Sequence, residues 1–367
     1  MIRICSTLRS QGLTGEPFAM ANETVSWPRY SVEIDEEGFP LFEGLRVQDE
    51  GLLSSLMHSI HRREANNPGS ILVTECEGEI CWVNSFDAPL VAQSVEAITR
   101  DSSTWVFPGG RKEKVVHTEI ESDEWSRLHS EVAGEARIPA VLSRKAQAEF
   151  LNRASVAELK PRAFRSVRPD SVQAPSFWDQ VYEEGRDGFE LGAPSPILKV
   201  EAERVKTLLP EGKKILVPGA GRGNDAEFLH SQGWKAEALD FSTHAEKEFH
   251  KRYPDSKVPY HVADVFDYFA KTSGAWNGIF EHTILCAIAP QERMRFLREV
   301  HKALTGDGLY FGIFYIRQFR GGPPFGMTQW ELREMTKDLF HIRDWRISTH
   351  SISTRMGQEL WAVLQKK

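Results

Sequence analysis

The sequence predicts an α/β protein in two parts, with an open, mostly parallel sheet preceded by a small α+β domain. The segment ILVPGAGRGND, residues 215–225, joins an apolar run to an amphipathic helix pattern through three alternating glycines. From there to the C-terminus, apolar runs of strand length alternate with helix patterns, which is typical of parallel sheets. Upstream, residues 22–155 hold short alternating segments around turn residues, with one clear helix pattern.

Length and composition agree with two soluble domains. A chain of 367 residues is longer than one hydrophobic core ordinarily supports. Of its residues, 41% are hydrophobic and 26% are charged, as in globular proteins. The net charge is −7 and the basic residues are scattered, so we expect no nucleic-acid partner. No apolar run is long enough to cross a bilayer, and the first twenty residues lack the core of a secretory signal. We therefore expect a cytoplasmic protein that does not bind membranes.

The first domain, residues 22–155, combines predicted hairpins with one helix. We expect a hairpin around Glu37-Gly38 and a helix over 47–64, whose first turn carries Asp49 and Glu50. Two further strand pairs follow, the second broken by PGG. The acidic turn EIDEEGFPLFEG, the LVTE strand and WVNSFDAPLV resemble a family of uncharacterised bacterial domains. That resemblance implies no reaction, so we expect an accessory domain, and it is our candidate for a homodimer contact.

Cysteines and histidines of this domain give weak metal patterns. A turn at Gly78-Glu79 in CEGEIC would place Cys76 and Cys81 opposite each other, a geometry compatible with a disulfide or half a metal site. His58 and His61 lie three apart on one predicted helix. Neither pair has a third ligand nearby, so we predict no metal and expect thiols at all four cysteines: Cys5, Cys76, Cys81 and Cys286.

The second domain, residues 165–367, begins after a linker predicted within 159–176, which is rich in Pro, Arg and Ser. Ser176 is a plausible N-cap for a helix that presents Trp178 and Tyr182 on one face. The following FELGAPSP is irregular and suited to covering a pocket. After the glycine loop we predict a strand ending at Asp240, one before Asp264 and one running to Glu281-His282, then a helix carrying Arg293, a strand, a helix and two closing strands.

Acidic residues follow two of these strands. Asp240 is placed to accept hydrogen bonds from both ribose hydroxyls of an adenosine ligand, although it could instead cap the next helix. Asp264 can accept from an adenine amine while Phe266 covers the ring. Ligands are expected at the carboxyl ends of the strands, and the glycine loop by itself also fits a dinucleotide.

The chain from Phe177 onward resembles the S-adenosylmethionine-dependent methyltransferases of the thiopurine S-methyltransferase family, most closely their thiol and halide branch. The resemblance is carried, in order, by FELGAPSPIL, ILVPGAGRGNDAEFL, ALDFS, ADVFDY, IFEHTILCAIAPQER and GGPPF. It implies a Rossmann-like class I methyltransferase with S-adenosyl-L-methionine as donor and S-adenosyl-L-homocysteine as product. Pro218 and Asp225 are consistent with a methyl donor as the ligand, because both residues are unusual in a phosphate-binding loop.

The resemblance also implies site residues. Those that contact the donor would be Trp178, Leu191, Gly192, Gly219, Gly221, Gly223, Asp225, Asp240, Phe241, Asp264, Val265, Phe266 and Glu281. The substrate side would comprise Phe189, His282, Tyr315, Pro324 and Phe325, and His282 is also the candidate catalytic residue because an imidazole can take a thiol proton. Phe189, Phe266 and Phe325 fit pocket and core equally, and Cys286 fits packing better than a nucleophile.

Two departures from the family narrow the substrate. FELGA at 189–193 replaces WDQGR and lacks its arginine, and His282 stands where the drug-methylating branch has an arginine. The first departure disfavours a bare halide as substrate, and the second disfavours an anionic thiopurine. The sequence therefore predicts methyl transfer to a small soft nucleophile, namely a thiol, a thiopurine-like compound or a selenium or tellurium species. The alternative is a donor-binding but catalytically silent regulatory module.

Overall fold

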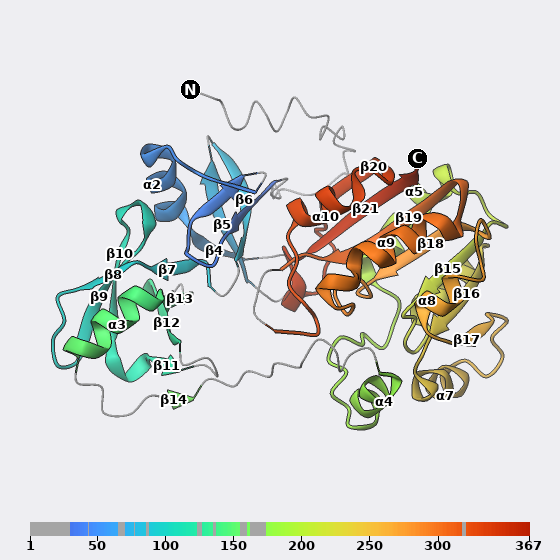
Figure 1. Cartoon of the computed structure of the whole chain (residues 1–367), viewed down its shortest axis with the longest axis horizontal. Coiled ribbons are helices and arrows are strands. Elements are labelled where there is room, and N and C mark those ends of the chain that lie inside the picture. Colours follow the sequence, from blue (N-terminus) through green and yellow to red (C-terminus); the bar gives the residue numbers. More distant parts are fainter. Residues whose placement is uncertain are drawn as a thin grey trace. The chain divides into compact units, whose positions relative to one another are not determined.

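The computed structural model forms two compact units, built mainly from residues before and after 165 (Figure 1). It describes residues 30–42, 44–64, 70–76, 78–85, 88–122, 127–134, 137–154, 160–161, 174–317 and 321–367. Cys5 and most of the linker predicted at 159–176 lie outside the described residues.

Among its described residues, the first unit combines three sheets with the helices α2 (Glu50–Ser59) and α3 (Arg144–Arg153). Its buried core includes Trp105, Phe107 and Phe150. One sheet has the order β3 (Leu45–Arg46), β2 (Pro40–Phe42), β1 (Tyr30–Ile34), β6 (Glu79–Ser85), β5 (Ser70–Cys76), β4 (His61–Glu64). A second sheet has the order β10 (Lys112–Val116), β9 (Ser102–Val106), β8 (Ser94–Glu96). A third sheet has the order β14 (Lys160–Pro161), β11 (Glu121–Ser122), β12 (Leu128–Val132), β13 (Ile138–Leu142), β7 (Leu90–Ala92).

The predicted hairpin and helix of this unit are present, but the helix is shorter. β1 and β2 pair antiparallel, and Asp49 caps α2 by accepting from the Leu52 N–H at 2.8 Å. The prediction of a helix to residue 64 was wrong, because 61–64 form β4 against β5. HRRE has no apolar residue to fix a helix face, whereas pairing satisfies its backbone groups. His58 and His61 therefore lie on different elements.

The predicted opposition of Cys76 and Cys81 was also wrong. In the antiparallel pair β5/β6, Cys76 is opposite Glu79 and Cys81 is opposite Thr74. The turn therefore lies one residue earlier in the chain than predicted, and it uses Gly78 at a φ of +83°. Both cysteines are buried thiols.

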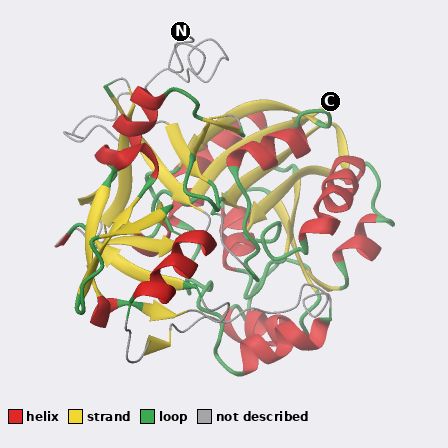
Figure 2. Ribbon diagram, turned by 60° about the vertical axis from the view of Figure 1, so that its left-hand side comes forward, coloured by secondary structure: helices red, strands yellow, loops and turns green. Residues whose placement is uncertain are grey.

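The second unit is a seven-stranded sheet with helices between its strands (Figures 1 and 2). The strand order is β17 (Tyr260–Val262), β16 (Lys235–Asp240), β15 (Lys214–Pro218), β18 (Trp276–His282), β19 (Leu304–Tyr315), β21 (Glu359–Lys366), β20 (Phe340–Ile347). The helices are α4 (Pro175–Glu183), α5 (Pro196–Leu208), α6 (Asn224–Ser231), α7 (Thr243–Arg252), α8 (Val265–Phe269), α9 (Arg293–Ala303) and α10 (Gln329–Thr336).

The topology of this sheet locates a ligand site. The strands from β17 to β19 are parallel, and β21 is antiparallel to both of its neighbours. Strand order reverses between β15 and β18, and open α/β sheets bind ligands at the carboxyl ends of strands beside such a point. The predicted mostly parallel sheet is confirmed. Ser176 is not the cap of α4, which begins at Pro175 after Ala174, since proline suits a first helical turn.

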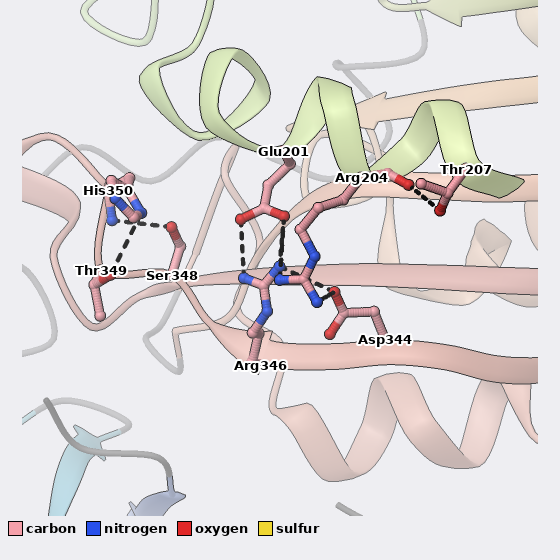
Figure 3. A network of polar contacts seen from close by, with 8 residues as sticks. All are labelled: Glu201, Arg204, Thr207, Asp344, Arg346, Ser348, Thr349 and His350. Carbon is pink, nitrogen blue, oxygen red and sulfur yellow. Dashed lines mark hydrogen bonds and ion pairs between the residues drawn. The ribbon is translucent and has the colours of Figure 1, made fainter. Parts of the chain in front are cut away.

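An ion pair between a buried carboxylate and a half-buried arginine fixes α5 to the edge strand β20. Figure 3 shows the Arg346 side chain reaching from β20 to Glu201 on α5. The two residues make paired bonds, Nη1 to Oε1 at 2.9 Å and Nη2 to Oε2 at 2.5 Å. Glu201 is only 3% exposed, and burial raises its pKa while Arg346 and Arg204 oppose that shift. The carboxylate therefore depends on the arginine as its partner.

Replacing Arg346 with methionine should destabilise the second unit by about 2 kcal/mol, because it leaves a buried carboxylate short of its main partner. Urea denaturation of the full chain measures the effect. Arg343→Met is the matched control, since Arg343 is an exposed residue of the same strand, bonded to Gln365. The double variant with Glu201→Gln and Arg346→Met should regain part of the stability that Arg346→Met loses, because it no longer buries an unpaired carboxylate. Equal stabilities of the Arg346 and Arg343 variants would contradict this account.

Candidate active site

The glycine loop between β15 and α6 is tightly packed. Gly219, Gly221 and Gly223 have φ of +64°, +51° and +72°, a region that side chains other than glycine rarely adopt. A Cβ on Gly221 would lie 2.9 Å from the Tyr182 hydroxyl oxygen, and one on Gly223 would lie 2.3 Å from the Phe249 ring. Gly221 and Gly223 are buried and Gly219 is exposed. Gly219 therefore has the most accessible backbone of the three glycines.

The carboxylate of Asp240 holds this loop from the end of β16. Its Oδ2 accepts from the Gly221 N–H at 2.9 Å, and its Oδ1 accepts from the Ser242 N–H at 3.0 Å. Burial raises the pKa of Asp240, and these two backbone bonds work against the shift. The alternative reading of Asp240 as a helix cap does not hold, because Ser242 is the N-cap of α7. Asp240 thus links the loop after β15 to the end of β16.

Asp264 follows β17 and caps the short helix α8. Its Oδ1 accepts from the N–H groups of Phe266 at 2.8 Å and of Asp267 at 3.2 Å. Phe266 is half-buried, with the Arg295 guanidinium 4.2 Å from its ring centroid. Asp240 and Asp264 follow neighbouring parallel strands, so both lie at the same edge of the sheet as Gly219.

The irregular segment between α4 and α5 is fastened to the glycine loop. Asp187 forms an ion pair with Arg222, and Glu190 accepts from the side-chain amide of Asn224 at 2.6 Å. Glu190 also accepts from the Gly192 N–H at 2.7 Å. These contacts place Leu191 and Gly192 beside the loop.

Aromatic rings continue this wall onto α4. The Phe189 ring meets Trp178 at 6.1 Å and Tyr182 at 5.9 Å between centroids, both edge to face. Trp178 and Phe189 are half-buried, whereas Tyr182 is buried against the glycine loop. The two half-buried rings keep surface for a ligand.

Two carboxylates lie near the end of β18 and differ in environment. Nδ1 of His282 lies 2.6 Å from Oδ2 of Asp225, in the first turn of α6. Glu281 is fully buried and accepts from the Tyr310 hydroxyl at 2.6 Å and the Leu285 N–H at 2.9 Å. Burial raises the pKa of Glu281 to about 7. The hydrogen bonds of the Glu281 carboxylate are thus made to buried groups of the protein, whereas the His282 side chain is partly exposed.

Arg293 organises the wall beyond His282, a role that the sequence did not reveal. Its guanidinium is 4% exposed and donates to the carbonyl oxygens of Leu285, Gly326 and Phe325, at 3.2, 2.9 and 2.8 Å. It thereby joins the segment after β18 to the turn at residues 321–326. Within that turn Phe325 is buried at 4% exposure, Pro324 is exposed, and Tyr315 at the end of β19 is half-buried. Cys286 is buried in the same wall, with its Sγ 3.1 Å from the Thr283 carbonyl oxygen.

Most of the predicted site residues follow the carboxyl ends of parallel strands or lie on the segment fastened to the glycine loop. Phe241 and Val265 are half-buried next to Asp240 and Asp264. Tyr182, Asn224 and Arg293 are not among the site residues that the sequence predicts. The sequence did contain a sign that Tyr182 belongs to the site, because it lies four residues after Trp178 and therefore on the same face of one helix. Within the described ranges no cluster of three or more His, Cys, Asp or Glu could hold a metal.

This sheet, with a glycine loop at its switch point and acids after the next two strands, defines an α/β protein that binds a nucleoside-containing ligand. The thiopurine S-methyltransferase family model matches residues 173–364, just over half of the chain. The chain belongs to this family through its second unit, and it is an S-adenosylmethionine-dependent methyltransferase. The resemblance inferred from the motifs is confirmed for these residues, and that of the first unit stays a prediction.

Similar proteins include thiocyanate methyltransferase 1 of Brassica oleracea, 25% identical over 55% of this chain and 89% of that protein. Thiopurine S-methyltransferase of Nitrosomonas eutropha is 27% identical over 42% of this chain and 78% of its own length. Probable thiol methyltransferase 2 of Arabidopsis thaliana is 30% identical over 41% of this chain and 67% of its own length.

Among solved structures, a Burkholderia thailandensis 1,6-didemethyltoxoflavin-N1-methyltransferase with bound S-adenosylhomocysteine is 18% identical. The match covers 57% of this chain and 94% of that one, with a TM-score of 0.44. A TehB-like methyltransferase from Corynebacterium glutamicum is also 18% identical, and the match covers 55% of this chain and 100% of that one, with a TM-score of 0.38.

In the part of the chain that the structure describes, no helix is both long and apolar enough to span a membrane.

Replacing Glu281 with glutamine should change how stability depends on pH. The folded-state pKa, about 7, lies above the ordinary 4.5, so the folded protein holds this proton more tightly than the unfolded chain. The resulting stability is full below about pH 4.5 and is lost as pH rises toward 7, by about 3 kcal/mol. Glutamine imitates the protonated acid and should remove this loss.

Urea denaturation at pH 5 and pH 8 measures the difference between the Glu281→Gln variant and the unmodified protein. The variant should gain relative stability at pH 8. Glu334→Gln is the control, because that carboxylate is on the surface of α10 and paired with Lys337. A stability difference for Glu281→Gln that is the same at both pH values would contradict the buried titration.

Proposed function

We propose that the enzyme methylates a small soft nucleophile, with a sulfur compound as the first choice and selenium or tellurium species as further candidates. Two observations support this proposal together. The sheet has an edge suited to binding the donor, and the relatives are named as thiocyanate, thiol and thiopurine methyltransferases. Segment 189–193 has no cationic side chain. This composition supports an uncharged acceptor over a bare halide.

The residues at the sheet edge fit S-adenosylmethionine. Gly219 is exposed after β15, where the methionine part of the donor would approach. We assign Asp240 to the ribose, Asp264, Val265 and Phe266 to the adenine, and Trp178, Leu191, Gly192 and Phe241 to the surrounding wall. Asp240 is well suited because its position is fixed by two backbone bonds before any ligand arrives. The other predicted donor contacts, Gly221, Gly223, Asp225 and the backbone of Glu281, stay proposals.

The donor supplies a methyl group on a positively charged sulfur. The protein's part in an in-line displacement is to align the nucleophile with that carbon and to exclude water. We assign Phe189, Tyr315, Pro324 and Phe325 to the acceptor wall, with His282 beside the acceptor. Arg293 keeps this wall in place through its three bonds to carbonyl oxygens. We also infer a cytoplasmic location, since thiols such as Cys76 and Cys81 persist in reducing compartments, and we propose the first unit as a homodimer contact.

Incubating the full chain with S-adenosylmethionine and single acceptors tests the function. The panel contains hydrogen sulfide, small thiols, a thiopurine, selenite, tellurite and iodide, with mass spectrometry of the methylated product. We expect turnover of at least one uncharged thiol and none of iodide. Tight donor binding without product from any acceptor would instead indicate a catalytically silent, donor-binding module.

Asp240→Ala should weaken donor binding roughly 10- to 100-fold, because a charged hydrogen bond to a hydroxyl contributes about 1.5–3 kcal/mol. Isothermal calorimetry with S-adenosylhomocysteine measures this affinity. Asp35→Ala is the matched control, because Asp35 also accepts from two backbone N–H groups, those of Glu37 and Phe39, but belongs to the first unit. Unchanged affinity in Asp240→Ala would overturn the ribose assignment.

A further inference from the structure

Asp225 and His282 form a carboxylate–imidazole pair that joins α6 to the end of β18. The Nδ1 to Oδ2 distance is 2.6 Å, and the side chains are 13% and 15% exposed respectively. The other oxygen of Asp225, Oδ1, accepts from the Ser195 N–H at 2.8 Å. Because both oxygens are engaged, the carboxylate is held in one orientation. Its place in the first turn of α6 also puts negative charge where the helix dipole favours it.

We propose that Asp225 is a positioning residue for His282, which takes the proton of an acceptor that arrives protonated. A carboxylate can only accept hydrogen bonds, so its partner Nδ1 carries the ring proton in the neutral imidazole. Nε2 then bears the lone pair and is the nitrogen that accepts a proton. This inference rests on the proposed function, and it reassigns Asp225 from the donor to the acceptor side.

The pair implies a substrate class. Halide and thiocyanate ions carry no proton at neutral pH, so a base has nothing to remove from them. An aliphatic thiol is mostly protonated near pH 7, and its sulfur becomes a strong nucleophile only after the proton leaves. An oriented base therefore selects acceptors with an S–H or Se–H bond.

The step balances without an oxidant or reductant. The S–H proton moves to Nε2 of His282, and the thiolate sulfur forms a bond to the methyl carbon. The electron pair of the broken carbon–sulfur bond stays on the donor's sulfur, which becomes neutral. The proton on His282 then passes to water, so that one proton is released for each methyl group transferred.

Glu281 and Phe280 are close neighbours of His282. Glu281, its neighbour in sequence, is buried, and the charge of His282 lowers the pKa of Glu281 against the larger effect of burial. The Phe280 ring lies 6.4 Å from the imidazole between centroids. A pH profile should therefore be compared between the unmodified protein and Asp225→Asn, which changes Asp225 and leaves Glu281 in place.

The first test compares two acceptors in the full chain. With 2-mercaptoethanol, which is protonated at neutral pH, Asp225→Asn should lower kcat/KM by about 10- to 100-fold and His282→Gln by at least as much. With 4-nitrothiophenol, which is already ionised, both variants should retain their kcat/KM. The matched control is Glu237→Gln, which alters a second carboxylate–histidine pair, Glu237 with His261 at 2.7 Å, within β16 and β17. Equal losses with both acceptors, or weaker donor binding in Asp225→Asn, would overturn the proposal.

The second test does not depend on turnover. Nitrogen-15 chemical shifts of the histidine rings report which nitrogen carries the proton, and the signals missing from His282→Gln identify His282. We expect the Nδ1–H form in the unmodified protein and a loss of that preference in Asp225→Asn. An Nε2–H form in the unmodified protein would overturn the proposal. If no thiol in the panel is methylated, the proposed function fails, while this measurement still decides whether the pair exists as described.

Discussion

The donor site depends on the buried carboxylate of Asp240. It binds the N–H of Gly221 on one side and that of Ser242 on the other, so the loop after β15 and the start of α7 share one anchor. The cost of burying a charge is offset here by backbone donors that are already in place. In the assignment that we propose, the same arrangement prepares the site for a ribose, because few groups would have to be ordered when the ligand binds.

The acceptor side is built differently, from contacts between distant parts of the chain. Arg293 gathers three carbonyl oxygens from two segments, and Asp225 holds His282 from a separate helix. Thr283, directly after His282, has a φ of +65°, a strained conformation for a residue other than glycine. Strain of this kind persists where surrounding contacts enforce it, and functional sites are where it clusters. The proposed ribose and adenine contacts thus lie at the ends of regular strands, whereas the proposed acceptor wall is held by long-range contacts and irregular backbone.

The sequence was sufficient for the elements that local patterns determine. The glycine loop, the strands leading to Asp240 and Asp264 and the presence of a helix at α2 all follow from periodicity and short-range chemistry. Features that depend on register were missed. HRRE became a strand because β5 pairs with it, and Cys76 and Cys81 are not opposite each other because the turn lies one residue earlier than predicted.

Long-range pairing was equally invisible in the sequence. Asp225 and His282 were both predicted site residues, but they lie 57 positions apart, and only the adjacency of β15 and β18 brings them together. Arg293 was placed on a helix without a role, because its three acceptors are backbone atoms that no side-chain pattern marks. The roles of individual residues therefore depend on strand order more than on motif.

A crystal structure of the full chain with S-adenosylhomocysteine and a small thiol is the most direct test of the central claim. The account predicts the ribose hydroxyls on Asp240, the adenine beside Asp264, and the thiol sulfur between the donor's sulfur and His282. A ligand bound away from the carboxyl ends of β15 and β16, or an acceptor on the far side of the donor from His282, would contradict it.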